Sequence, residues 1–193
     1  MKRICVFCGS NRGSHPDYTE AARQLGQLLA ARGIRLVYGG GKVGLMGEIA
    51  DAVLESGGEV TGVIPGFLQA KEVGHDDLTE MIVVETMHTR KAIMAEQADG
   101  FIAMPGGFGT MDELCEILTW AQLGLHQRPI GLLNVRGYFQ TLNTLFDHMV
   151  AERFLHQKNR EMLLSHHDPE RLLDMMAQYR PPDVAKWLDN SKI

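Results

Sequence analysis

The stretch FIAMPGGFGTMDE, residues 101–113, decides the fold expected for this chain. Its first four residues are apolar and predict a buried strand. Pro105 ends that strand, because proline has no N–H to donate to a neighbouring strand. Glycines then leave the backbone amides uncovered, and the residues from Thr110 onward have the pattern of a helix. The stretch therefore predicts a strand, a glycine-rich loop and a helix in succession.

The same alternation of strand and helix extends along the whole chain. Aliphatic runs predict strands at residues 4–8, 35–38, 60–64, 82–85, 101–104 and 130–135. Helical periodicity predicts helices at residues 16–32, 44–56, 87–97, 110–123, 138–153 and 169–178. Most of the strands are apolar on both faces, as parallel strands between two helix layers are. We therefore expect an α/β fold with a doubly wound, mostly parallel, Rossmann-like sheet and helices on both faces.

Length and charge limit the class of protein. A chain of 193 residues suits one domain, and we expect a single nucleotide-binding Rossmann-like domain at residues 1–179, followed by a peripheral tail at 180–193. The net charge of −5 opposes non-specific nucleic-acid binding but permits a small phosphorylated ligand. The apolar run at the N-terminus is too short for a signal peptide, and none approaches the ~18 residues of a spanning helix. We expect a cytoplasmic protein with no nucleic-acid or membrane partner.

The cysteines and histidines do not predict a redox or metal site. Cys5 and Cys8 form a C-x-x-C on a predicted strand, where residues three apart point to opposite faces. They should therefore be buried structural thiols that neither bridge nor share a metal. No pair of histidines combines metal-ligand spacing with a third ligand, so we expect no metal.

A first glycine-rich loop, VYGGGKVGLMGE, occupies residues 37–48. The spacing of Gly39, Gly41 and Gly44 matches G-x-G-x-x-G, but a dinucleotide site also expects an acid about 20 residues later. A proline–glycine pair stands there instead, and the lysine of this loop lacks the Ser or Thr that a P-loop requires. What remains is a general expectation that backbone amides, including those of Gly40 and Gly41, approach a phosphate.

The second loop, residues 105–113, allows two interpretations. TMDE is a capping box, in which Thr110 caps the helix and Glu113 reaches back to it. A cap does not require the preceding Pro-Gly-Gly-x-Gly, however, whereas a site that binds a phosphate on bare amides does. The segment ETMHTRKA, residues 85–92, places Arg90 and Lys91 at the same sheet edge, either as ligand-binding groups or as a solvated basic pair.

With these segments in place, the sequence resembles the LONELY GUY (LOG) family of cytokinin riboside 5′-monophosphate phosphoribohydrolases, formerly described as possible lysine decarboxylases. The resemblance extends from the first strand to about residue 175. It rests on YGGGKVGLMG, VIPGFL, MHTRKA, PGGFGTMDE and WAQLGLHQRPIGLLNV. One departure is slight: Met111-Asp112 stands where relatives often have Leu-Glu.

The resemblance implies hydrolysis of the N-glycosidic bond of a (cytokinin) nucleoside 5′-monophosphate, with AMP also expected as a substrate and with no cofactor. It implies Arg90 and Glu113 as the catalytic pair. The substrate would contact Glu72, Lys91, Gly106, Gly107, Phe108, Gly109, Thr110, Met111 and Asp112, and Gly40 and Gly41 would close the other side. The resemblance also implies a homodimer or larger assembly, which agrees with the predicted helix 110–123 being apolar nearly all round.

Two other functions compete with this one. The same fold and phosphate loop occur in carriers of nucleotide-like cofactors, in which no bond is broken. Lysine decarboxylation, the older label, usually requires pyridoxal phosphate on a lysine and a larger fold.

Overall fold

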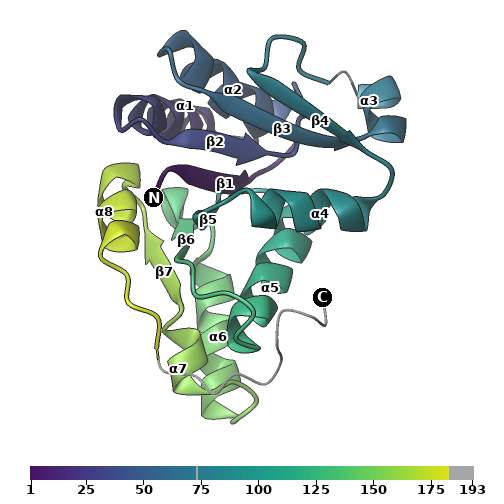
Figure 1. The fold of residues 1–193 in the computed structure, drawn as a ribbon. Coiled ribbons are helices and arrows are strands. Elements are labelled where there is room, and N and C mark those ends of the chain that lie inside the picture. The colour runs from purple at the N-terminus through teal and green to yellow at the C-terminus, as the bar shows by residue number, and fades with distance from the viewer. Residues whose placement is uncertain (73, 183–193) are drawn as a thin grey trace.

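The computed structural model describes residues 1–72 and 74–182. Its centre is a seven-stranded parallel sheet with strand order β4-β3-β2-β1-β5-β6-β7 (Figure 1). The strands are β1 (Arg3–Phe7), β2 (Arg35–Tyr38), β3 (Val60–Pro65), β4 (Glu80–Val84), β5 (Gly100–Ala103), β6 (Ile130–Leu133) and β7 (Leu163–His166). The expected doubly wound parallel sheet is confirmed.

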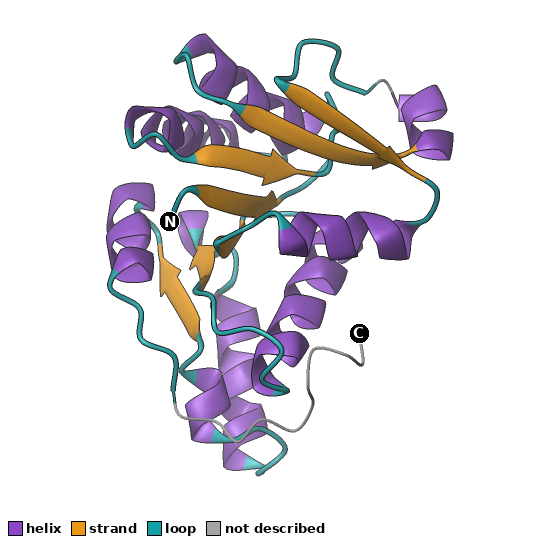
Figure 2. Cartoon of the chain, in the orientation of Figure 1, coloured by secondary structure: helices purple, strands orange, loops and turns teal. Residues whose placement is uncertain are grey.

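Helices cover both faces of the sheet (Figure 2). One face packs against α1 (Pro16–Ala31), α2 (Gly44–Glu55) and α8 (Pro169–Ala177). The other packs against α4 (Met87–Glu96), α5 (Phe108–Gln122) and α6 (Gln140–Ala151). The shorter helices are α3 (Gly66–Glu72), the 3₁₀ turn η1 (Val135–Gly137) and α7 (Gln157–Arg160).

The central strand β1 contributes to both cores. Ile4 and Val6 pack on the α1 side, and Cys5 and Phe7 pack on the α5 side, because successive side chains of a strand alternate between faces. Cys8, just beyond the strand, joins the α1 side. Cys5 and Cys8 are therefore free, buried thiols on opposite faces, as their spacing predicted.

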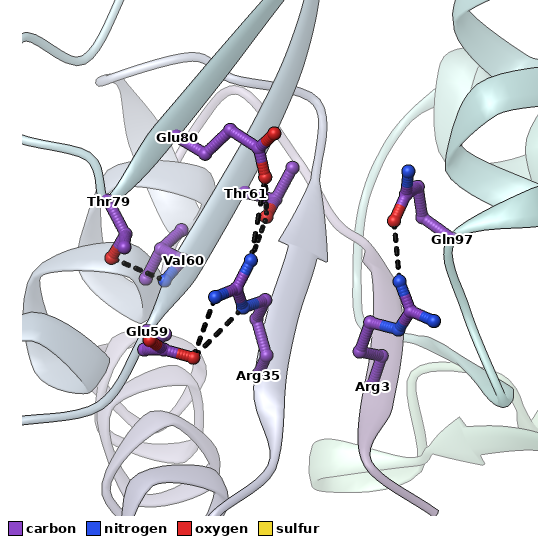
Figure 3. Close-up of polar contacts among 8 residues, drawn as sticks. All are labelled: Arg3, Arg35, Glu59, Val60, Thr61, Thr79, Glu80 and Gln97. Atoms are coloured by element: carbon purple, nitrogen blue, oxygen red, sulfur yellow. Dashed lines mark hydrogen bonds and ion pairs between the residues drawn. The ribbon is translucent and has the colours of Figure 1, made fainter.

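The amino ends of the strands are tied together by charged side chains (Figure 3). Arg35 lies at the start of β2, and its guanidinium is 2.7 Å from Glu59 and 3.5 Å from Glu80 of β4. At the start of β1, the Arg3 guanidinium donates to the Gln97 side chain at 2.7 Å. These contacts are partly exposed, so each contributes little to stability. In a doubly wound sheet, ligands bind at the opposite edge, at the carboxyl ends of the strands.

The prediction of a capping box at residues 110–113 is wrong. Helix α5 begins at Phe108, with Gly107 as its N-cap, so Thr110 lies inside the first turn and is buried. A β-carbon at Gly106 would overlap the Thr110 hydroxyl, so the close approach of the loop to Thr110 requires a glycine there. Glu113 is engaged by Arg90 and not by the helix start.

Strand β7 and helix α3 were not expected from the sequence. Strand β7 is a half-buried edge strand whose sequence, LLSH, is too short and mixed to give a periodic signal. Helix α6 begins at Gln140, because Arg136 and Gly137 have left-handed backbone angles that end η1 first. The expected tail lies largely at residues 183–193, outside the described residues.

Candidate active site

The site lies where the order of the sheet reverses. Strands β2, β3 and β4 follow one another on one side of β1, while β5, β6 and β7 extend on the other. In a doubly wound sheet the connections beyond β1 and β5 diverge to opposite faces and leave a crevice at the carboxyl ends of these strands. A cavity of about 310 Å³ opens there. Its lining residues are Val6, Phe7, Cys8, Gly9, Ser10, Gly39, Met46, Arg90, Gly107, Phe108, Gly109, Thr110 and Glu113.

One wall of the cavity is the beginning of α5. The first intrahelical hydrogen bond runs from the Met111 amide to the Gly107 carbonyl at 3.2 Å. The amides of residues 107–110 precede it and have no acceptor within the helix, and the glycine N-cap has no side chain to satisfy them. All four residues line the cavity. The positive end of the helix dipole and a row of free donors therefore face the space where an anion would bind.

The loop after β1 completes this wall. The Gly9 amide donates to the Pro105 carbonyl at 3.1 Å, and the Gly9 carbonyl accepts from the Leu45 amide at 3.0 Å. These bonds hold the loop between the glycine-rich loop 104–107 and the start of α2. Gly44 has φ +64°, and a β-carbon there would collide with the backbone of Ser10, so this contact needs a glycine.

Arg90 and Glu113 form an ion pair at the base of the cavity. The Arg90 Nη1 atom lies 2.9 Å from Glu113 Oε1, and the two side chains are only 11% and 10% exposed. Arg90 Nε also donates to the Val63 carbonyl at 3.0 Å, which fixes the plane of the guanidinium. Arg90 comes from α4 and Glu113 from α5, so the two helices jointly place one positive and one negative group beside the free amides.

Burial dominates the electrostatics of Glu113. Desolvation raises its pKa above the ordinary value, and the positive charge and hydrogen bond of Arg90 offset only part of this rise. The same burial, reinforced by the Glu113 charge, raises the pKa of the Cys8 thiol. Cys8 is therefore a neutral thiol at physiological pH, without the thiolate character of a nucleophile.

Gly39 has a different role from the one that its motif suggests. A β-carbon at Gly39 would overlap the guanidinium of Arg90, so a glycine is required there to make room for that side chain. Gly40 and Gly41 lie off the cavity lining. The Gly40 carbonyl accepts from the His75 amide at 3.1 Å, and Gly41 forms an isolated bridge with Gly74. Within the first glycine-rich loop, Gly39 thus leaves room for the Arg90 side chain, while Gly40 and Gly41 bind the segment before β4.

Several of the predicted substrate-binding residues lie outside the cavity lining. Lys91 Nζ is 3.1 Å from carboxylate oxygens of both Asp112 and Glu116, so it joins α4 to α5. Met111 packs against the core on the α5 side, and Gly106 lies behind the cavity wall. Glu72 is the last residue of α3, and its side chain lies outside the described part of the structure. Contacts of these residues with a substrate stay a prediction.

The sequence analysis missed the contribution of the first loop. Cys8, Gly9 and Ser10 line the cavity, yet the sequence analysis considered this segment only for its cysteines. A signal was present, because Gly9-Ser10 directly follows the most apolar early strand, and a central strand of a doubly wound sheet points at the ligand. Met46, also in the lining, follows Gly44 on α2 and carried no comparable signal.

Within residues 1–72 and 74–182, no group of three or more His, Cys, Asp or Glu side chains is arranged to hold a metal ion. None of the described helices combines the length and the apolar character needed to cross a bilayer.

Comparison with known proteins identifies the family. The model of a family described as "Possible lysine decarboxylase" matches residues 46–176, more than half of the chain. A probable cytokinin riboside 5′-monophosphate phosphoribohydrolase of Oryza sativa subsp. japonica is 53% identical over 177 residues, covering 92% of this chain and 79% of the relative. The chain belongs to the LOG family. A second LOG protein, the cytokinin riboside 5′-monophosphate phosphoribohydrolase of Arabidopsis thaliana, is 51% identical over 94% of this chain and 83% of its own length.

Solved structures of other proteins share this fold. The molybdenum cofactor binding protein of Rippkaea orientalis superposes with a TM-score of 0.68 at 24% identity, covering 92% of this chain and 97% of that chain. The Moco carrier protein of Chlamydomonas reinhardtii superposes with a TM-score of 0.70 at 23% identity, covering 91% and 95%. At this identity the similarity shows a shared fold and carries no conclusion about function.

Proposed function

We propose that this LOG-family protein hydrolyses the N-glycosidic bond of a cytokinin riboside 5′-monophosphate, releasing the free base and ribose 5-phosphate. The observation that carries the proposal is the buried Arg90–Glu113 pair in the same cavity as the free amides of residues 107–110. The curated relatives at about half identity, named as phosphoribohydrolases, support the same reaction.

The 5′-phosphate would bind at the start of α5. Its oxygens would accept hydrogen bonds from the amides of Gly107, Phe108, Gly109 and Thr110, where the helix dipole favours negative charge. Phe108 contributes mainly its amide, because its side chain is 95% exposed. Glu113 lies one helical turn beyond these amides, a separation that suits a ribose ring between phosphate and carboxylate.

Glu113 would stabilise the sugar as the bond breaks. Cleavage between C1′ and the base nitrogen gives the ribose oxocarbenium character, which a nearby carboxylate favours. In its ionised form Glu113 can also accept a proton from the attacking water, whose oxygen forms the new bond to C1′. Arg90 keeps Glu113 in position and balances its charge, and the nitrogen of the departing base takes up a proton.

Base release tests the proposal directly. Purified protein incubated with isopentenyladenosine 5′-monophosphate and, in parallel, with AMP should release the free base from at least one of them, as measured by chromatography. We expect AMP to be a substrate as well, and the ratio of kcat/KM for the two nucleotides reports which base the site prefers. Tight binding of both without release of either base would instead support the carrier function.

The lysine decarboxylase label receives no support from the lining of the cavity. That reaction uses a lysine to hold pyridoxal phosphate. The described lining residues contain no lysine, and Lys91 is engaged by Asp112 and Glu116. Carbon dioxide release from lysine by protein supplied with pyridoxal phosphate would contradict this assignment.

We further propose that the protein is a homodimer or a larger homo-oligomer. A mostly apolar groove of about 220 Å³ runs between α5, α6 and the segment up to β7. Its apolar lining residues include Leu118, Phe146, Met149, Leu155 and Leu163. A second copy covering this groove would remove apolar surface from water. Light scattering at micromolar concentration should give at least twice the monomer mass, and a monomeric mass would refute the assembly.

The cytoplasmic location expected from the sequence stays a prediction. Fractionation of the producing cells, with immunodetection of the protein, tests it.

A further inference from the structure

The connection between β6 and α6 contacts the glycine-rich loop before α5 through one hydroxyl group. Tyr138 follows η1, and its phenol O–H donates to the carbonyl of Gly106, 32 residues earlier in the chain. Gly106 is outside the cavity lining, whereas the next residue, Gly107, is in it. The hydroxyl therefore contacts the outer side of the loop whose inner side faces the cavity.

The bonded carbonyl controls an amide that faces the cavity. The Gly106 carbonyl and the Gly107 N–H belong to one planar peptide unit, in which a trans bond makes the two groups point in opposite directions. Holding the oxygen on the outer side thus sets the direction of the N–H. A peptide unit between two glycines has few steric barriers to rotation, because neither neighbour has a β-carbon. Such a unit needs an external contact to keep one orientation.

Contacts with two neighbouring rings position the side chain of Tyr138 for that hydrogen bond. Its ring makes edge contacts with Phe139, at 5.0 Å between centroids, and with Tyr18 of α1, at 6.1 Å. The adjacent Phe139 is buried, and its amide donates to the Asn134 side chain at 2.7 Å. Tyr138 is 45% exposed, and its ring is contacted by α1 on one side and by its own buried neighbour on the other.

The backbone before Tyr138 is bent in an unusual way. Arg136 has φ +54° and Gly137 has φ +71°. A non-glycine residue in the left-handed region is strained and persists where its surroundings hold it. Here Arg136 Nη1 lies 3.0 Å from Asp17 of α1. This bend directs the following tyrosine toward the glycine-rich loop.

We propose that Tyr138 is a positioning residue that locks the Gly106–Gly107 peptide with its N–H toward the phosphate of the substrate. The inference rests on the proposed function, because it assigns the phosphate to the start of α5. Tyr138 itself does not line the cavity, so it acts through the peptide and not on the reacting atoms.

The test replaces Tyr138 by phenylalanine, which keeps the ring contacts and removes the hydroxyl. A phosphate contact holds the substrate and the transition state equally, so its loss raises KM and leaves kcat nearly unchanged. We expect KM for AMP and the dissociation constant of ribose 5-phosphate, measured by calorimetry, to rise about fivefold to tenfold together, the size of one typical hydrogen bond. Binding of adenine, which has no phosphate, should not change. Tyr18→Phe is the matched control, since it removes a hydroxyl from the adjoining ring and leaves the Gly106 carbonyl contact in place.

Other outcomes separate the role proposed for Tyr138, which we call the lock, from the proposed function of the protein. Wild-type turnover with an unchanged KM and an unchanged ribose 5-phosphate affinity in Tyr138→Phe would overturn the lock alone. An equal loss of adenine and ribose 5-phosphate binding, or a matching loss in Tyr18→Phe, would overturn it too by indicating general loosening. If the wild type releases no base but binds ribose 5-phosphate more tightly than Tyr138→Phe, the reaction is wrong and the lock stands. Should Tyr138→Phe fail to fold, a crystal structure of the unliganded wild type decides, because a Gly106 carbonyl turned away from the Tyr138 hydroxyl contradicts a fixed peptide.

Discussion

Three ion pairs join α4 to α5, and two of them involve neighbouring residues on both helices. Arg90 pairs with Glu113, and Lys91, the next residue of α4, pairs with Asp112, the preceding residue of α5. The first pair is buried and lines the cavity, whereas Asp112 of the second is largely exposed and neither member lines it. One residue along a helix is a rotation of about 100°, which is enough to turn a side chain away from a site. The same pair of helices thus supplies a chemical site on one side and an ordinary helix–helix contact on the other.

The largest effect should come from replacing the inner acid. Glu113→Gln keeps the size of the side chain and its hydrogen bond with Arg90 but removes the carboxylate to which we assign the stabilisation of the sugar. We expect kcat/KM for AMP to fall by about 10³-fold or more, within the range of a lost acid–base group. Asp112→Asn, the matched change on the outer pair, should stay within about threefold. Equal losses in the two variants would remove the distinction between the pairs.

Replacing Arg90 by glutamine should have the next largest effect. Glu113 would lose its partner in a buried setting, which costs about 3 kcal/mol of folding stability in comparable pairs. We expect kcat/KM to fall about 10²-fold, with a lower thermal midpoint in calorimetry. Lys91→Gln serves as the control and should change neither quantity appreciably.

Arg90→Gln should also change the pH dependence of kcat/KM. Burial raises the pKa of Glu113, and Arg90 pulls it partly back. If the carboxylate form is the active one, kcat/KM falls on the acid side as pH drops through this raised pKa. Removing the positive charge raises the pKa further, so the acid limb of Arg90→Gln should move to higher pH. An unmoved limb in Arg90→Gln, with the profile measured between pH 4 and 9, would show that Glu113 does not control it.

A smaller effect should follow from Gly39→Ala. The added β-carbon would displace the Arg90 guanidinium and so disturb the inner pair without deleting a charge. We expect roughly a tenfold loss in kcat/KM, consistent with misplacement of a catalytic group. Gly66→Ala is a suitable control, because its nearest new neighbour would be a Val83 methyl at an ordinary 3.7 Å. Full activity in Gly39→Ala would mean that Arg90 has freedom that its contacts do not indicate.

The smallest effect should come from Lys91→Met. Methionine keeps an unbranched side chain of similar length at a position that is 13% exposed, and it removes the contacts to two partly exposed carboxylates. We expect a loss of less than about 1 kcal/mol in denaturant unfolding, with kcat/KM within about threefold. A large rise in KM would instead place Lys91 in the substrate site, as the family resemblance implied.

The sequence predicted the sheet well because its strands carry strong local signals. Strands such as β1 and β5 are apolar on both faces, and each is followed by a glycine-containing loop. The edge strand β7 is half-buried and only four residues long, so its local pattern was too weak to separate it from a loop. Its position depends on pairing with β6, which is a tertiary contact.

The site was predictable in its residues but not in its geometry. The family resemblance implied the pair Arg90 and Glu113, on two segments expected at the same sheet edge, and the structure joins them at 2.9 Å. Other residues were misjudged or missed, because the sequence does not reveal where α5 begins or which side of a loop faces the cavity. Thr110 was assigned as a cap although it is buried within the helix, and Cys8, Gly9 and Ser10 were not assigned to the site.

The central claim is that the free amides at the start of α5 bind the phosphate while Glu113 faces the ribose. A crystal structure of Glu113→Gln with AMP tests it most directly, because the variant should bind the nucleotide without consuming it. We predict phosphate oxygens within hydrogen-bond distance of the amides of residues 107–110 and the ribose between them and residue 113. A nucleotide bound instead at Lys91 and Asp112, with the inner cavity empty, would contradict the account.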